Sequence, residues 1–393
     1  MTPLDTASGA SVGVPATDPF TVESLTVEVY RAPVARPVRT SFGTMTDRPA
    51  VVVAARSTDG VIGYGEVWCN FPEPAAGYRA DLIARVLAPA VVGRTWPGPG
   101  AVFDYLSERF RLLGIQAGEP GPFAQCIAGI DIALWDMAAR RARLPLWRFL
   151  GGSGGGRVPA YASGIGPEDP AGQAASARTQ GHRAFKLKVG FGGRHDVANL
   201  DLIRSELGRE ATIAVDANQA WSPGVARSMI RSLAPYTPAW LEEPIPADRP
   251  ADDWRNLADH SPIPLAGGEN LYGEAAFGKA IETGALAVIQ PDVTKWGGIS
   301  GCLPVVRRIL AAGRRYCPHH LGAGIGVLAS AHLLAAAGGD GLLEVDSNPN
   351  PLREGLAQPF PQLLDGNLVL SDSPGLGVAP DGALSGLRIH RNR

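Results

Sequence analysis

The strongest constraint on the fold is a repeat of strand-like and helix-like patterns between residues 158 and 346. Eight apolar, strand-like segments occur there, and each of the first seven is followed by a stretch of helical length. Alternating β-α units of this kind predict a closed barrel of parallel strands, an α/β fold. The segments are 158–164, 184–190, 212–218, 239–244, 264–270, 286–293, 314–320 and 341–346.

The chain has 393 residues, more than a barrel of roughly 250 residues requires. Residues 1–20 are rich in Ala, Gly, Pro, Ser and Thr, which indicates a disordered tail. We assign 21–150 to an N-terminal α+β capping domain and 151–346 to the barrel. Residues 347–393 are expected to pack back on the capping domain.

Within the capping domain the patterns predict three strands followed by three helices. Asp59-Gly60 favours a hairpin turn between the second and third strands. Residues 36–49, between the first two strands, are predicted to form a polar loop. The strands are 24–30, 50–55 and 62–68, and the helices are near 75–93, 101–113 and 121–142.

Charge and cysteine content exclude several classes of protein. The formal net charge of −2 gives no reason to expect nucleic acid or an acidic membrane as partner. The N-terminus lacks the basic start and apolar stretch of a secretory signal, and no apolar run reaches the length of a membrane span. Cys69, Cys126, Cys302 and Cys317 form no CxxC pair, which is typical of reduced cysteines in a cytoplasmic protein.

Polar residues follow the predicted barrel strands at a regular interval. Successive steps from Lys188 to Glu344 are 23 to 28 residues long, about one β-α unit each. These side chains should therefore meet at one rim of the barrel, where active sites of this fold lie. The series is Lys188, Asp216, Glu242, Glu269, Asp292, His319 and Glu344.

Three of these residues, Asp216, Glu242 and Glu269, are carboxylates on consecutive strands. Such carboxylates repel one another unless a cation joins them, and oxygen-only ligands suit Mg²⁺ best. The alternative is three structural acids that pair with nearby Arg or Lys. Glu243 neighbours Glu242 on the same strand and should point to the other side, so we leave it out of the metal set.

Candidate acid/base groups flank the three carboxylates. Lys186 and Lys188 share one face of a strand, and their like charge together with a metal would lower the ammonium pKa of either, favouring a neutral base. Alternatively, both lysines only bind a substrate carboxylate; we expect this role for Lys186. Asp292 precedes His319 by one strand and could fix the tautomer of its imidazole, although a lone His is more often structural.

The combined motifs resemble the enolase superfamily, in particular its mandelate racemase-like subgroup and the acid-sugar dehydratases within it. The resemblance covers about residues 21–380 and implies a modified (β/α)7-8 barrel with an N-terminal capping domain. The motifs are Lys186-Leu-Lys188, Asp216-Ala-Asn218, Leu241-Glu242-Glu243-Pro244, Gly268-Glu269-Asn270, Asp292 with Lys295-Trp-Gly-Gly298, Pro318-His319 and Glu344.

The resemblance also implies roles for individual residues. Asp216, Glu242 and Glu269 would bind Mg²⁺, with Mn²⁺ as an alternative cation, and Lys188 would act opposite His319–Asp292. Glu344 would donate a hydrogen bond to the substrate carboxylate, which requires its protonated form. Asn218, Asn270 and Lys295 would stand behind the ligand and acid/base residues and support them. His320 is the alternative to His319 as the acid/base residue. Asp292 stands where the muconate-cycloisomerase-like subgroup has a lysine, which disfavours cycloisomerisation and N-acylamino acid racemisation.

Substrate choice in the resembled family depends on capping-domain loops, here 38–49 and 68–78. The contacts we single out are Thr44, Arg48, Asn70 and Phe71. The glycine-rich segment 322–326 could hold a distal anion through backbone N–H groups, although close loop packing is the simpler interpretation.

The predicted reaction is dehydration of an acid sugar to a 2-keto-3-deoxy acid. The alternative is racemisation or epimerisation of a 2-hydroxy acid or an amino acid derivative, and a non-catalytic acid-sugar binding barrel ranks third. We expect a small-molecule carboxylate as the partner of the site and a homo-oligomeric assembly.

Overall fold

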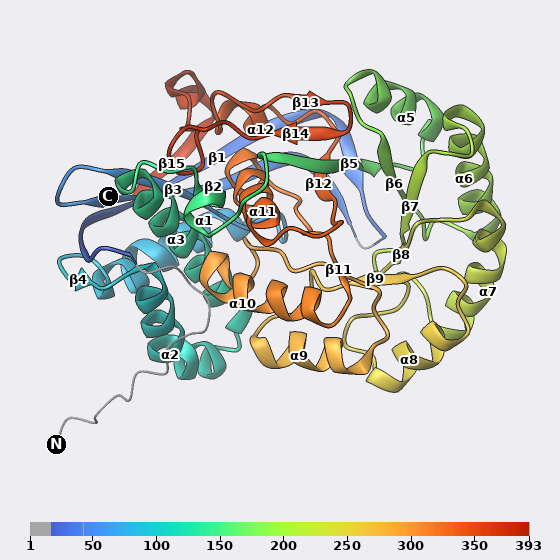
Figure 1. The fold of residues 1–393 in the computed structure, drawn as a ribbon, viewed down its shortest axis with the longest axis horizontal. Coiled ribbons are helices and arrows are strands. Elements are labelled where there is room, and N and C mark those ends of the chain that lie inside the picture. Colours follow the sequence, from blue (N-terminus) through green and yellow to red (C-terminus); the bar gives the residue numbers. More distant parts are fainter. Residues whose placement is uncertain (1–16, 42, 393) are drawn as a thin grey trace.

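The computed structural model describes residues 17–41 and 43–392. Figure 1 shows two parts side by side, a sheet with helices at the left and a barrel at the right. The predicted tail falls mostly on residues 1–16, which lie outside the described residues, and strand β1 already begins at Phe20.

The first domain contains an antiparallel sheet in the order β15-β1-β2-β3, with β4 beside β1. Its helix α3 packs against β3 because β3 has glycines where the two backbones meet: a Cβ on Gly63 or Gly65 would collide with the α3 backbone. The elements are β1 (Phe20–Arg39), β2 (Thr44–Ser57), β3 (Ile62–Val67), α1 (Ala75–Leu82), β4 (Thr95–Trp96), α2 (Pro99–Ala117) and α3 (Pro120–Arg141).

Two predictions for this domain are wrong in detail. Residues 36–49 are not a loop: β1 and β2 extend into this segment and pair through Arg39 and Thr44. The predicted helix 75–93 also changes form after Leu82, through a π-helical turn and a 3₁₀ turn that contains Pro89. Proline cannot donate the backbone hydrogen bond that a continuing α-helix needs.

The barrel strands run parallel in the order β11-β10-β9-β8-β7-β6-β5, and β12 pairs with β5. All eight predicted strands are present, most of them shorter than predicted. They are β5 (Arg157–Ile165), β6 (Ala184–Lys188), β7 (Thr212–Asp216), β8 (Leu241–Glu242), β9 (Leu265–Gly267), β10 (Val288–Ile289), β11 (Arg315–Tyr316) and β12 (Leu343–Asp346).

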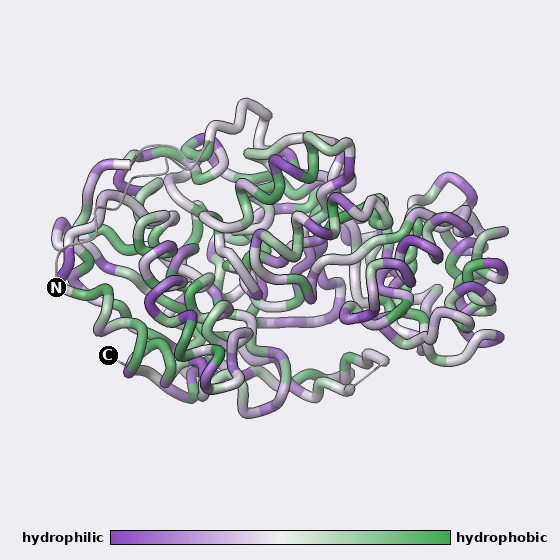
Figure 2. Tube along the Cα trace, turned by 90° about the horizontal axis from the view of Figure 1, so that it is seen from below, coloured by the Kyte–Doolittle hydropathy of each residue, from purple (hydrophilic) through white to green (hydrophobic). Residues whose placement is uncertain are grey.

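Helices connect successive strands and cover the outside of the barrel (Figure 1). In Figure 2 purple and green segments alternate along the coils at the right, as expected for helices with one buried face. Helix α11 (Gly324–Ala337) differs, because nearly all its residues are buried. The helices are α5 (Pro170–Thr179), α6 (Gly193–Leu207), α7 (Pro223–Leu233), α8 (Ala251–Asp259), α9 (Glu274–Thr283), α10 (Gly298–Ala311) and α11 (Gly324–Ala337).

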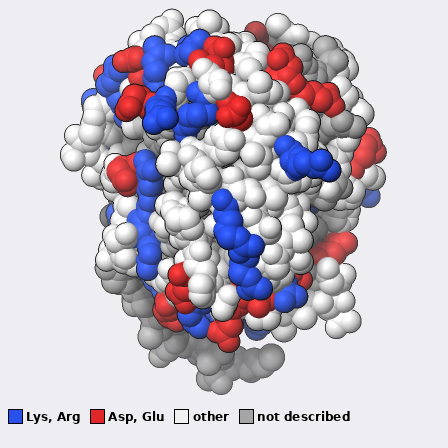
Figure 3. Space-filling view, turned by 90° about the vertical axis from the view of Figure 1, so that its right-hand side faces the viewer, with Lys and Arg blue, Asp and Glu red and all other residues white. Residues whose placement is uncertain are grey.

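The outer face of these helices carries both charge signs intermingled (Figure 3). Exposed ion pairs join neighbours there, such as Arg178 with Glu206 and Arg249 with Asp253. Among the described residues, no helix is long and apolar enough to cross a membrane.

The centre of the barrel is filled mainly by small side chains around two aromatic rings. Tyr161 and Trp240 meet edge to face with their ring centroids 5.4 Å apart. Ala184, Ala214 and Ala266 leave room for these rings, and all are buried. The barrel is therefore a solid support beneath its rim, not a channel.

The C-terminal segment contacts both parts. Strands β13 (Leu363–Leu364) and β14 (Asn367–Val369) form a hairpin that pairs with β5, and β15 (Arg388–Asn392) pairs with β1. Helix α4 (Leu146–Phe149) joins the two parts, and α12 (Pro351–Gly355) follows β12.

One buried histidine makes stability depend on pH. His332 of α11 accepts a hydrogen bond from the Trp147 backbone N–H at 3.1 Å, and burial lowers the pKa of His332 to about 4. The unfolded chain binds a proton there below its ordinary pKa of about 6.5, whereas the folded chain does not. The stability contribution is therefore present above about pH 6.5 and is lost as the pH falls toward 4.

We predict that lowering the pH from 7 to 5 removes about 2 kcal/mol of unfolding free energy through His332 alone. His332→Asn retains an acceptor for Trp147 but has no titrating ring, so this part of the pH dependence should disappear. Urea unfolding of both proteins at pH 7 and 5 measures the difference. An unchanged pH dependence in the variant would contradict the assignment.

Candidate active site

Backbone register brings the first polar strand ends together. Lys188 of β6 is paired with Asp216 of β7, and Asp216 with Glu242 of β8. Glu269, Asp292, His319 and Glu344 come from the ends of β9 to β12. In the strand order, the three carboxylate strands β7, β8 and β9 lie between β6 and β10–β11. Lysine and histidine thus approach from opposite sides of the carboxylates.

A cavity of about 280 Å³ opens at this rim between the barrel and the first domain. Both candidate acid/base side chains, Lys188 and His319, line it. Its lining residues are Thr40, Trp68, Asn70, Phe71, Lys188, Asn218, Gln219, Glu269, Asn270, Lys295, His319 and Leu321.

Lys188 is held by two oxygen acceptors. Its Nζ donates to Asp216 Oδ2 at 2.6 Å and to Asn218 Oδ1 at 2.9 Å. Asn218 in turn donates its backbone N–H to Asp216 Oδ1 at 2.8 Å. Ser41 of the β1–β2 turn contacts this corner, because its hydroxyl donates to the Asn218 carbonyl at 2.6 Å. These contacts fix the direction of the Lys188 ammonium.

Lys186 is fully buried and lies deeper than Lys188. Its Nζ is 2.7 Å from Glu242 Oε1 and 2.8 Å from Glu344 Oε1. It is not among the residues that line the cavity, although the sequence predicts that it neutralises a substrate carboxylate. In this conformation Lys186 instead neutralises two carboxylates of the protein.

His319, and not His320, faces the cavity. His319 Nδ1 is 2.7 Å from Asp292 Oδ2, and its Nε2 is 2.8 Å from Glu269 Oε2. Asp292 is fixed by the backbone N–H and hydroxyl of Thr294. The His320 ring turns toward the Ala323 carbonyl, 3.1 Å from its Nε2, and is buried. The geometry therefore pairs His319 with Asp292.

The prediction that Glu344 is protonated does not hold in this arrangement. Burial raises the pKa of Glu344, but the charges of Lys186 and His319 outweigh burial and lower that pKa to about 2. The carboxylate accepts hydrogen bonds from the Ser163 hydroxyl and the His320 backbone N–H. In these two contacts Glu344 is the acceptor.

The neutral lysine predicted from the sequence depends on a metal ion beside it. Burial lowers the pKa of Lys188, and Lys186 lowers it further, but the adjacent Asp216 carboxylate prevails and the pKa is raised. The pKa of Lys186 is raised as well, because Glu242 and Glu344 outweigh its burial. A neutral Lys188 therefore requires another cation to take over the charge of Asp216.

The donor set fits such a cation. Asp216, Glu242 and Glu269 provide only oxygen atoms, the ligands that Mg²⁺ prefers. Burial, and after it the charge of Asp216, raise the pKa of Glu242 to about 7. In this conformation lysine and histidine groups stand among the carboxylates, and no described group of three acidic, His or Cys side chains is gathered around one point.

The structure adds residues that sequence reasoning missed. Gln290 Nε2 and Trp240 Nε1 donate to Glu242 Oε2 at 2.7 and 3.2 Å and fix this carboxylate. Ser163 holds Glu344 from β5. Gln290 could have been found from the sequence, because it is a polar residue within the apolar run that leads to Asp292. No sequence signal marks Trp240 or Ser163.

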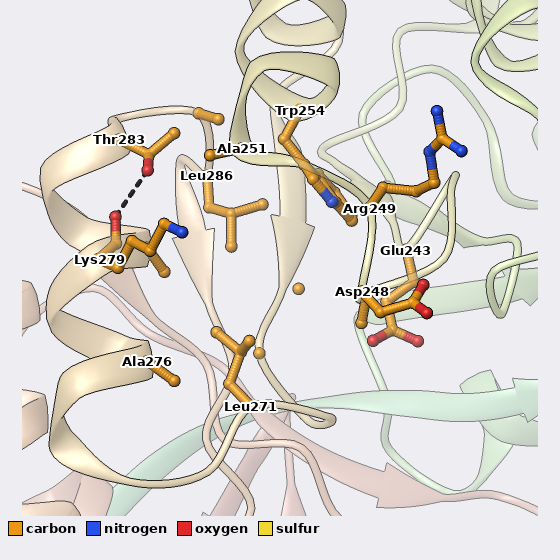
Figure 4. Close-up of a pocket in the computed structure, with 15 residues that line it drawn as sticks. Glu243, Asp248, Arg249, Ala251, Trp254, Leu271, Ala276, Lys279, Thr283 and Leu286 are labelled. Atoms are coloured by element: carbon orange, nitrogen blue, oxygen red, sulfur yellow. Dashed lines mark hydrogen bonds between the residues drawn. The ribbon is translucent and has the colours of Figure 1, made fainter.

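Glu243 points away from the rim. It lines a second cavity, of about 260 Å³, between α8 and α9 on the outside of the barrel (Figure 4). Asn270 Nδ2 donates to both of its oxygens at 2.8 and 3.1 Å. Asn270 Oδ1 accepts from Lys295 Nζ at 2.8 Å, and Lys295 also reaches Glu269 Oε2 at 3.4 Å. Asn270 and Lys295 thus connect the two carboxylates Glu243 and Glu269.

The four predicted specificity residues separate into two pairs. Asn70 and Phe71 line the active-site cavity, whereas Thr44 and Arg48 do not. Arg48 is buried in β2 and forms an ion pair with Asp346 at the end of β12. It therefore fastens the first domain to the barrel.

Comparison with known proteins agrees with this geometry. The family model "Mandelate racemase / muconate lactonizing enzyme, N-terminal domain" matches residues 23–151, and "Enolase C-terminal domain-like" matches residues 170–384. A solved mandelate racemase/muconate lactonizing enzyme from Bordetella bronchiseptica RB50 is 51% identical, with a TM-score of 0.88 over 94% of this chain and 99% of that chain.

Relatives with assigned activities are more distant. L-talarate/galactarate dehydratase of Salmonella typhimurium is 31% identical over 85% of this chain and 81% of its own length. D-galactarolactone cycloisomerase of Agrobacterium fabrum is 28% identical over 84% and 89%. L-talarate dehydratase from Polaromonas sp. JS666, solved with Mg and L-glucarate, is 26% identical, with a TM-score of 0.80 over 94% and 98%. The cycloisomerase weakens the sequence argument against cycloisomerisation.

We predict that Asp216→Asn, Glu242→Gln and Glu269→Gln each weaken Mg²⁺ binding at least about tenfold, because each removes one anionic oxygen ligand. Titration calorimetry with Mg²⁺ on the chelator-treated protein measures the affinity. Glu206→Gln is the control, since Glu206 pairs with Arg178 on the barrel surface. Unchanged affinity in all three site variants would rule out this ligand set.

Proposed function

The chain belongs to the mandelate racemase/muconate lactonizing enzyme family of the enolase superfamily, and from that premise we propose that it removes the α-proton of a carboxylate substrate. The observation that carries the proposal is the cavity lined by both Lys188 and His319, with the carboxylates of β7 to β9 between their strands. A binding protein without catalysis has no need of two held acid/base groups, which argues against the non-catalytic alternative.

Mg²⁺ is the proposed cofactor, held by Asp216, Glu242 and Glu269. When bound, it would supply positive charge for the substrate carboxylate and for the enediolate that forms after proton removal. It would also balance the carboxylates that raise the pKa of Lys188. Burial and the charge of Lys186 lower this pKa, so both favour the neutral amine.

Lys188 is the proposed base. Its Nζ takes the proton from the α-carbon, and Asn218, whose oxygen lies 2.9 Å away, keeps the amine directed. The electron pair of the broken C–H bond moves into the enediolate. Lys186 keeps positive charge beneath this region while it pairs with Glu242 and Glu344.

His319 is the proposed acid. Its Nδ1 faces Asp292, which leaves Nε2 to hold the transferable proton. In a dehydration, Nε2 protonates the 3-hydroxyl, the C3–O bond breaks and water leaves. The enol product then becomes a 2-keto-3-deoxy acid.

The main reaction we propose is therefore the dehydration of an acid sugar. The cavity walls offer several hydrogen-bonding side chains, Thr40, Asn70, Asn218, Gln219 and Asn270, which suit a substrate with many hydroxyl groups. Two relatives described above, both dehydratases of acid sugars, agree with this choice.

Racemisation or epimerisation is the second candidate, because the same pair of groups serves it. His319 would then return a proton to the α-carbon from the face opposite Lys188. Expulsion of a ring oxygen in place of water, as a cyclic substrate would require, is a variant of the first reaction. We also propose a cytoplasmic location, which the four free, buried cysteines support.

We predict that Lys188→Ala and His319→Asn each reduce turnover by at least about 10²-fold, because each removes a proton-transfer group. In deuterium oxide, His319→Asn should still exchange the α-proton through Lys188. Steady-state kinetics and NMR of the recovered substrate measure the two effects. If His320→Asn is inactive while His319→Asn is active, the assignment of the histidine is wrong.

The product distinguishes the two reactions. With Mg²⁺ and a panel containing galactarate, L-talarate and arabinonate, we expect loss of one water and formation of a keto acid, detected by mass spectrometry. Chelation should abolish the reaction. If the substrate instead takes up deuterium without losing water, and both stereoisomers appear, dehydration is rejected in favour of racemisation or epimerisation.

A further inference from the structure

Glu66 is a buried acid of the first domain that no step of the proposed reaction uses. It stands near the end of β3, where its backbone is paired with Val52 of β2. Its side chain crosses to the barrel: Oε1 accepts the Ala323 backbone N–H at 2.5 Å, and Oε2 accepts the Gly326 backbone N–H at 2.8 Å. Only 2% of Glu66 is exposed.

The two N–H groups belong to the beginning of helix α11. The first N–H groups of a helix have no partner within it and carry partial positive charge. Ala323, the N-cap residue of α11, has no side chain that could satisfy them. Glu66 supplies the missing acceptor from the other domain, 257 residues away in sequence.

The glycines of 322–326 are shaped around this contact. A Cβ on Gly322 would overlap the Glu66 carboxylate, and one on Gly326 would overlap the His320 ring. The segment that the sequence offers for a distal anion thus binds a carboxyl side chain of the protein itself. Close packing and binding of this side chain are here the same feature.

The turn held in this way carries His319. Only His320, Leu321 and Gly322 separate His319 from Ala323, and this turn has further ties. Asn70 Nδ2 donates to the Leu321 carbonyl at 2.5 Å, and Asn350 Nδ2 donates to the Gly322 carbonyl at 2.9 Å. Glu344 also holds the turn, because it accepts the His320 backbone N–H at 3.1 Å. Glu66 is the carboxyl side chain that holds the start of α11, and it binds through both oxygens.

We propose that Glu66 is a positioning residue for the acid half of the site. By holding the start of α11 it keeps His319 at the angle that delivers its proton, while it makes no contact with Lys188. This inference rests on the proposed function for its catalytic consequence. Its structural part, that Glu66 holds the His319 turn, stands on the contacts alone.

Glu66→Gln replaces one accepting oxygen by an N–H₂ group that faces a backbone donor. Asp136→Asn is the matched control, since Asp136 of α3 is also a buried carboxylate that accepts two backbone N–H groups, from Tyr64 and Leu376. These contacts join the first domain to the C-terminal segment and not to the His319 turn.

The first readout uses Mg²⁺ with D-galactonate and galactarate as probes in deuterium oxide. Glu66→Gln should slow water loss by about tenfold or more, because a displaced acid reacts poorly, and keep α-proton exchange within about threefold. The ratio of exchange to water loss therefore rises, and KM changes little. An unchanged ratio, or an equal rise in Asp136→Asn, overturns the proposal.

The second readout needs no substrate, so it separates this inference from the proposed function. Hydrogen exchange, followed by mass spectrometry of peptides covering 318–330, should accelerate about tenfold in Glu66→Gln and stay unchanged in Asp136→Asn. Equal acceleration in both variants, or none in Glu66→Gln, overturns the proposal even if neither probe reacts. Should Glu66→Gln fail to fold, Glu66→Asp keeps the charge with a shorter reach, and the same criteria apply to it.

Discussion

The organisation of the barrel rim follows from its excess of negative charge. Among the described residues, six carboxyl groups that lie at the rim or are linked to it through Asn270 form one connected cluster with three ammonium groups and one imidazole. Because most of these groups are buried, water compensates little of the imbalance, and each carboxylate must accept several hydrogen bonds or share a cation. The carboxylates are Asp216, Glu242, Glu243, Glu269, Asp292 and Glu344, and the cationic groups are Lys186, Lys188, Lys295 and His319.

This imbalance bears on two predictions about protonation. The sequence suggested a neutral lysine from the pair Lys186–Lys188 beside a metal ion, and a protonated Glu344 from family resemblance. Both stay predictions, because the sign of a pKa shift depends on all neighbouring charges, including that of the proposed Mg²⁺. Asp216 outweighs Lys186 at Lys188, and Lys186 with His319 outweighs burial at Glu344. Strand spacing predicts where each charged group lies along the rim. The pKa of each group depends on its distances to all the others, which the spacing does not give.

The barrel itself could be predicted because its information is local and repeated. Each β-α unit contains an apolar strand that ends in a polar residue. The regular spacing of these residues therefore predicts that Asp216, Glu242 and Glu269 share one rim. Contacts between the domains carry no such signal. The sequence predicts a loop at Arg48, yet Arg48 pairs with Asp346. Glu66 binds Ala323, the N-cap residue of α11, which lies 257 residues later in the chain. Such pairs become visible only when the two domains are placed together.

One short segment of the first domain both lines the cavity and binds the turn that carries His319. Trp68, Asn70 and Phe71 line the cavity, whereas Glu66 meets the start of α11 a few residues earlier. Asn70 takes part in both, because it lines the cavity and also binds the Leu321 carbonyl beside His319. A change that enlarges the cavity at this segment would therefore move the turn that carries the acid. Lys188 is instead held through Asn218, which Ser41 of the β1–β2 turn contacts, and Trp68 reaches the predicted metal ligand Glu269 only indirectly, through Lys295. A substitution in this segment is therefore expected to disturb the His319 side of the site more than the Lys188 side, because only the His319 turn is bound by it directly.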